Sequence, residues 1–182
     1  MREFAETCEA VGATPKKIEK TRLVGDYLRS LPLKDAVRAA LFFTGRAFPK
    51  FAEEVTHVGG KLIGEALSAV TGLSAKEMSA AYRRHGDLGG VAQELLAGKT
   101  ENRSLTLAEA EEAFHEFATR RGLGPKLDML TQKLRRLPPL EAKYFIKILT
   151  GELRIGLNED WWKKRWPVPS SGHCRRSSVL TC

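Results

Sequence analysis

The sequence has few cysteines and no arrangement of them that suggests a disulfide framework. Its three cysteines are Cys8, Cys174 and Cys182, whereas a small disulfide-stapled domain needs several closely spaced pairs. No apolar run approaches the roughly 18 residues that span a bilayer. The start, MREFAETCEA, is too polar and charged for a secretory signal. These absences exclude a disulfide-rich secreted domain and a membrane protein, and they predict a cytoplasmic chain.

Patterns that would carry catalysis or metal binding are also missing. The four histidines, at positions 57, 85, 115 and 173, have no partners at the spacing of a zinc site. The sequence contains neither a glycine-rich phosphate loop ending in Gly-Lys-Ser/Thr nor a nucleophile elbow. We therefore predict no catalytic residue and no metal ligand in this chain.

The net charge of +8 is unevenly distributed. Residues 161–182 carry five basic side chains and no acidic one, which leaves 25 basic and 22 acidic side chains in the first 160 residues. Overall charge is therefore weak evidence for a nucleic-acid partner, and local clustering matters more. Residues 120–147 hold eight basic side chains against two acidic ones. That cluster suits either a solvated helix face or an anion-binding surface.

Apolar residues recur at helical spacing along nearly the whole chain. Two capping boxes, Ser74 with Glu77 and Thr106 with Glu109, predict helix starts, and Asp87 is a further candidate N-cap. No alternation typical of a β-strand exceeds about four residues. The sequence therefore predicts an all-α fold.

The predicted helices form a compact two-lobed domain over residues 1–160. A polar stretch near residue 100 divides it into lobes at about 1–100 and 101–160. Residues 161–182 have no apolar period and many Arg, Ser, Trp and Pro residues, so we expect a basic, disordered tail.

The stretch RRGLGPKLDML places glycines at a junction between two predicted helices. One helix ends on Gly122, and the next begins at Gly124 with Lys126 in its first turn. Free N–H groups and the positive end of the helix dipole favour a phosphate at such a start. Glycine lets the backbone approach the anion closely, and the lysine would add a charge-assisted hydrogen bond. These three residues are candidate phosphate ligands.

A second stretch, LTGELRIGL, has a similar composition. A helix is predicted to end on Gly151, and Arg154 and Gly156 follow in the turn. Gly122 and Gly151, each taken alone, are better explained as helix C-caps. The two turns taken together, with the basic cluster between them, make contacts with the phosphates of a duplex an equally good explanation. Such contacts hold the duplex without reading its sequence.

Several stretches of the sequence resemble one known family. They include TPKKIEKTRLVGDYLRSL, RHGDLGGVAQELL, SLTLAEAEEAFHEFA and GLGPKLDMLTQKLRRLPPLEAKYFIKILTGELRIGL. In order and spacing they are similar to the amino-terminal DNA-binding domain of ATP-dependent DNA ligases, and the resemblance runs from about residue 1 to 159. The most specific part is the succession of Gly-Asp-Leu-Gly, Glu-Ala-Lys-Tyr and Gly-Glu-Leu-Arg-Ile-Gly-Leu.

This resemblance implies an all-helical, two-lobed domain on the minor-groove side of nicked duplex DNA. It implies sequence-independent contacts with both phosphate backbones, a monomer, and roles in DNA ligation, repair, recombination and replication, with a nucleoid association in a prokaryote. The backbone-binding turns of the family fall here on Gly122, Gly124, Lys126, Gly151, Arg154 and Gly156. Lys61 belongs to a third such turn, in which the Gly-Ile-Gly form of the family is altered to VGGKLIG.

The family also implies what this chain lacks. Its adenylated lysine lies in a Lys-x-Asp-Gly motif of a separate nucleotidyltransferase domain, to which ATP and Mg²⁺ belong. The nearest string here, KLDM, has no such glycine. We therefore expect a chain without cofactors that neither adenylates nor seals DNA alone.

Three alternatives remain open at this stage. The chain is a DNA-binding module, a helical interaction module that pairs with a separately encoded ligase core, or an active ligase in its own right. The loss of pattern from about residue 160 has two explanations, a reading-frame shift or truncation, which we favour, and a genuine basic tail that adds DNA affinity.

Overall fold

The computed structural model describes residues 1–157, and every regular element in that range is an α-helix. The first group is α1 (Arg2–Ala13), α2 (Lys17–Ser30) and α3 (Leu33–Phe43), and the second is α4 (Gly60–Thr71), α5 (Ala75–His85) and α6 (Leu88–Leu95). The third group is α7 (Leu107–Thr119), α8 (Leu123–Arg136) and α9 (Pro139–Leu149). The prediction of an all-α fold is confirmed for this part of the chain. The predicted tail at 161–182 lies outside the described residues.

The helix starts follow the capping signals of the sequence. Both predicted capping boxes are formed: Ser74 with Glu77 begins α5, and Thr106 with Glu109 begins α7. Asp87 caps α6, because its Oδ1 accepts a hydrogen bond of 2.8 Å from the Gly90 N–H. In each case the side chain satisfies an N–H group that has no partner within the helix.

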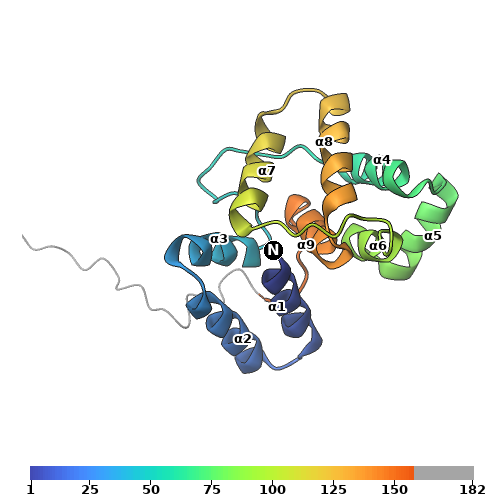
Figure 1. Ribbon diagram of the computed structural model, residues 1–182. Helices are drawn as coiled ribbons and strands as arrows, with labels where there is room; N and C mark the ends of the chain where they lie inside the picture. Colours follow the sequence, from blue (N-terminus) through green and yellow to red (C-terminus); the bar gives the residue numbers. More distant parts are fainter. Residues whose placement is uncertain (158–182) are drawn as a thin grey trace, which may run out of the picture.

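Helix α9 lies at the centre of the molecule (Figure 1), with α1–α3 on one side and α4–α6 on the other. Helix α6 packs on α9, α4 packs on α8, and α1 packs on both α2 and α9. A single hydrophobic cluster joins these elements, and its largest fully buried side chains include Phe4, Phe42, Phe114 and Phe145. The halves of the chain therefore share one core, while the lobe boundary near residue 100 stays a prediction.

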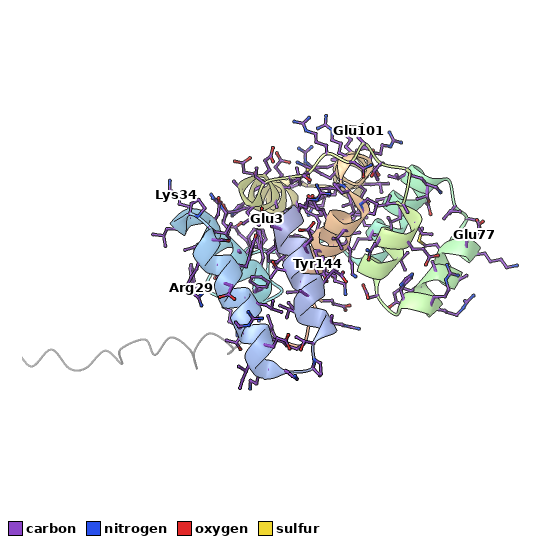
Figure 2. All side chains as sticks on the ribbon, turned by 60° about the horizontal axis from the view of Figure 1, so that its bottom comes forward. Glu3, Arg29, Lys34, Glu77, Glu101 and Tyr144 are labelled. Carbon is purple, nitrogen blue, oxygen red and sulfur yellow. The ribbon has the colours of Figure 1, made fainter. Side chains whose placement is uncertain are left out.

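Two close contacts fix the position of α9. In Figure 2 Tyr144 lies beside α1, and its hydroxyl donates a hydrogen bond of 3.0 Å to Glu9 Oε1. On the opposite side, Gly89 of α6 approaches so closely that a Cβ there would lie 2.8 Å from the Lys143 carbonyl oxygen and from Lys147 Cγ. Helix α9 is thereby held between α1 and α6, and its carboxyl end points to the candidate site.

No helix in the described range is long and apolar enough to cross a bilayer.

Candidate functional site

The connection between α3 and α4, residues 44–59, organises the candidate site. Its buried Thr56 contacts two helices that are distant in sequence. Lys126 Nζ, from the first turn of α8, donates a hydrogen bond of 2.7 Å to the Thr56 carbonyl oxygen. Thr56 Oγ1 donates one of 3.4 Å to the carbonyl oxygen of Leu149, the last residue of α9. The starts of α4 and α8 and the end of α9 are therefore held in one neighbourhood.

Three adjoining clefts border this connection, and we call them together the trough. The α8 cleft, of about 650 Å³, is lined by His57, Thr119, Arg120, Arg121, Gly122 and Lys126, among others. The α4 cleft, of about 710 Å³, is lined by residues that include His57, Gly59, Gly60, Asp87, Lys147 and Glu152. The Gly45 cleft, of about 350 Å³, is lined by residues that include Gly45, Arg46, Lys50, Thr56, Thr150 and Gly151. The first two clefts share His57, and the last two share Thr56.

The start of α8 opens onto the α8 cleft. Gly122 is its N-cap with φ +86°, and the helix begins at Leu123, before the predicted start at Gly124. Helix α7 ends at Thr119, so the prediction that a helix ends on Gly122 was wrong. Left-handed backbone at Gly122 turns the chain into the new helix, where the N–H groups of the first turn have no helical partner. Because Gly122 and Gly124 are both exposed, this backbone is accessible to an anion.

Lys126 lies differently from the expected surface contact. Only 5% of the residue is exposed, and its ammonium group donates to Thr56 rather than projecting from the surface. Desolvation by burial lowers the pKa of this ammonium group. No carboxylate of the described residues forms an ion pair with it. In this geometry Lys126 holds the connection before α4 in place. The residue lines the α8 cleft but is almost entirely buried there.

Helix α4 also begins on glycine. Gly59 is its N-cap and Gly60 its first residue, both are exposed, and the first turn contains no acidic residue. The Lys61 side chain is 93% exposed and lies 4.0 Å from Glu65 Oε1. A pair this exposed contributes little to stability, so the lysine is available to an anion. The starts of α4 and α8 therefore border two clefts that share His57.

Gly151 has a different role from Gly122. It follows α9 with φ +75°, and its N–H donates a hydrogen bond of 3.1 Å to the Ile148 carbonyl oxygen. The next N–H, that of Glu152, donates one of 2.8 Å to the Lys147 carbonyl oxygen. These bonds cap the carboxyl end of α9, and no helix follows within the described residues. The predicted helix end at Gly151 is thus confirmed to within two residues, but the N–H groups of Gly151 and Glu152 are already bonded and are not free for an anion.

The rest of the second turn presents a cationic side chain. Arg154 is exposed, has φ +47°, and its Nη2 lies 3.1 Å from Glu152 Oε2. At Gly156 a Cβ would lie 2.6 Å from Lys20 Nζ, because that ammonium group donates a hydrogen bond of 2.7 Å to the Ile155 carbonyl oxygen. The turn is thus fixed to α2 while Arg154 projects into solvent.

Cations exceed carboxylates along the trough. The described residues that line the α8 cleft include Arg120, Arg121 and Lys126 and no carboxylate. In the α4 cleft, the half-buried Asp87 lies 3.3 Å from Lys147 Nζ. Burial raises the pKa of the Asp87 carboxyl group, but the Gly90 N–H and the Lys147 ammonium group together bring it below its ordinary value. The positive charge is therefore concentrated at the α8 end.

Sequence reasoning missed several residues that line the trough or hold the turn after α9 in place. Thr56, His57 and Lys20 have no motif around them, and their roles arise from contacts between segments distant in sequence. One weak signal was present, since the VTHVGGK stretch places a histidine directly before a glycine-initiated helix. Burial of the flanking Thr56 and Val58 could not be inferred from so short a pattern.

Comparison with known proteins agrees with this fold. The family described as DNA ligase N terminus matches residues 1–162. A probable DNA ligase of Koribacter versatilis is 41% identical over 160 residues, which cover 87% of this chain and 28% of that protein. A DNA ligase of Archaeoglobus fulgidus is 33% identical, with 86% of this chain and 30% of that protein covered. The chain thus spans less than a third of the length of these relatives.

The all-helical architecture and the match over residues 1–162 agree with each other. The chain therefore belongs to the DNA ligase N-terminal domain family.

Proposed function

We propose that the trough binds the phosphate backbone of duplex DNA without reading its sequence, as the DNA-binding part of an ATP-dependent DNA ligase. One observation carries this proposal: the glycine-initiated helices α4 and α8 begin at adjoining clefts, and the α8 cleft is lined by three cations and no carboxylate. A helix start and nearby cations both favour phosphate.

The contacts divide into three groups. Exposed backbone at Gly122 and Gly124 binds one phosphate, assisted by Arg120 and Arg121 of the α8 cleft. The start of α4, with the exposed Lys61, binds a second. Outside the three clefts, the exposed Arg154 contributes a point charge beyond the end of α9.

Three of the predicted ligands act indirectly in this arrangement. Lys126 positions Thr56, and through it the start of α4. Gly151 ends α9 close to Gly45, whose carbonyl oxygen would lie 3.9 Å from a Cβ at Gly151. Gly156 leaves space for Lys20. These residues hold the contacting groups in place rather than touching phosphate.

The chemistry of ligation belongs to the part of the relatives that this chain does not match. The role of this chain is then to hold a nicked duplex for a catalytic core that carries ATP and Mg²⁺. Phosphate contacts fix the position and register of a protein on a duplex.

The salt dependence of duplex binding tests the proposal. If about four phosphates are neutralised, a plot of log K against log salt has a slope near −3.6, and unrelated duplex sequences give the same slope.

Arg154→Ala should flatten this slope by about 0.9, since one phosphate contact is lost. Lys126→Met should weaken binding without that change in slope, because its ammonium group lies beneath the surface. Fluorescence anisotropy with labelled duplexes at several salt concentrations measures all three.

Arg29→Ala is the matched control. Arg29 is an exposed arginine of α2 at the edge of the molecule (Figure 2) and, like Arg154, has an exposed carboxylate partner. Unlike Arg154, it lies in none of the turns that are proposed to contact phosphate. Its removal should leave the slope unchanged. A flat slope for the unmodified protein would contradict phosphate binding and would favour the alternative, an interaction module that pairs with a separate ligase core.

A further inference from the structure

His57 occupies the boundary between two clefts of the trough. It is exposed, whereas its neighbours Thr56 and Val58 are buried. Since Thr56 is also bonded to α8 and α9, the backbone on this side of His57 cannot shift easily. The imidazole is therefore presented between the α8 cleft and the α4 cleft, both of which it lines.

The other described histidines have carboxylate partners, and His57 does not. His115 Nδ1 lies 2.7 Å from Glu54 Oε2, and His85 Nε2 forms a pair with Glu94. His57 has no hydrogen bond or ion pair to any described residue. An exposed histidine without a partner, placed in a cationic cleft, is available to an external anion.

The charges around His57 come from several elements. Arg120, Arg121 and Lys126 face it across the α8 cleft, and Tyr82, Asp87, Lys147 and Glu152 face it across the α4 cleft. An ion pair between the imidazole and a phosphate bound in the α8 cleft requires the protonated ring, which has a positive charge and an N–H donor on each nitrogen.

We propose that His57 is a phosphate ligand of the trough that acts only when its imidazole is protonated, so that duplex binding strengthens as pH falls. This inference rests on the proposed function and adds to it a residue and a pH dependence. Imidazole changes charge between about pH 5 and 8. Because only the protonated imidazole carries the charge that pairs with a phosphate, affinity rises as pH falls through this range and is lower above it.

The salt slope measured at two pH values tests the proposal. One added phosphate contact steepens the slope by about 0.9. Lowering the salt concentration from 1 M to 0.1 M then raises the affinity about eightfold more than it does without that contact. The unmodified protein should show this difference between pH 8.5 and pH 5.5. His57→Asn, which is neutral and tolerates left-handed backbone such as the φ of +52° at this position, should show the shallower slope at both. His57→Lys should show the steeper slope at both.

His115→Asn is the control, because it removes a histidine that already has a carboxylate partner, Glu54. It should keep the pH difference of the unmodified protein. Circular dichroism melts of each variant show whether it is folded at both pH values. A pH difference that persists in His57→Asn, or a shallow slope at pH 8.5 in His57→Lys, would overturn the role of His57. Absence of salt-dependent binding by the unmodified protein at either pH would instead overturn the proposed function.

Discussion

At the scale of single residues, burial decides what a charged side chain does. Lys126 and Lys61 both lie in the first turn of a helix that begins on glycine, and both are candidate phosphate ligands from sequence. Lys61 extends into solvent, whereas Lys126 is buried and bonded to the Thr56 carbonyl oxygen. Transferring an ammonium group from water to the protein interior is costly unless its hydrogen bonds are replaced. The Thr56 bond meets part of that need, which makes Lys126 a positioning residue.

The close approach of α6 to α9 gives a prediction at this scale. Gly89→Ala should destabilise the protein by about 1–3 kcal/mol, because its Cβ would lie 2.8 Å from backbone and side-chain atoms of α9 that cannot easily move. Gly64→Ala is the counterpart, since Gly64 is inside α4 and has nothing within 4 Å of its Cβ position. It should stabilise by about 0.5–1 kcal/mol. Urea unfolding measures both, and a neutral Gly89→Ala would refute the tight contact.

At the scale of elements, glycine occurs at the amino-terminal end of one helix of the site and at the carboxyl-terminal end of another. Gly122 is the N-cap of α8, where free N–H groups and the positive end of the dipole face the α8 cleft. Gly151 follows the carboxyl end of α9, where the N–H groups are already bonded to carbonyl oxygens and the dipole is negative. Only the first arrangement attracts phosphate through its backbone. The second turn therefore depends on the Arg154 side chain.

The N-cap of α6 gives a prediction about acid stability. The pKa of Asp87 is lowered in the folded state, so its contribution to stability is present above the unfolded pKa of about 3.9 and is lost as pH falls through the lower folded value. Asp87→Asn keeps a capping side chain but leaves the buried Lys147 unpaired, and should cost about 1–3 kcal/mol at pH 7. Urea unfolding from pH 7 to pH 2 should show that this difference shrinks at low pH.

Asp26→Asn is the comparison for that experiment. Asp26 forms ion pairs on the exposed surface of α2, where such pairs contribute little. A loss of stability as large as that of Asp87→Asn would mean that burial beside Lys147 is not the cause.

At the scale of the whole molecule, one core joins three groups of helices. The trough is lined by residues from all three groups or from the connections between them. The connection between α3 and α4 belongs to the first half of the sequence, whereas α8 and α9 belong to the second. Separating the halves would therefore remove both the core and the trough.

The intact chain should show no ligase chemistry by itself. It contains no Lys-x-Asp-Gly motif, so incubation with radiolabelled ATP and Mg²⁺ should leave no covalent AMP on the protein, and a nicked duplex should stay unsealed. A full-length DNA ligase assayed in parallel provides the positive control. A labelled band that survives denaturing electrophoresis would contradict this expectation and would establish the third alternative, an active ligase.

The sequence by itself determined the helical class, the capping boxes of α5 and α7, the cap at Asp87 and the family. Each of these depends on residues close together in the chain, where spacing alone sets which groups can meet. It could not decide which end of a helix Gly122 serves, because the sign of φ depends on how α7 and α8 are placed in the fold.

Only the tertiary structure decided that Lys126 is buried, that the amides after Gly151 are already bonded, and that His57 lies between two clefts. These features arise from contacts such as Lys126 with Thr56, which join residues 70 positions apart in the chain. No local pattern encodes such a contact, because it forms only when the shared core brings the two segments together.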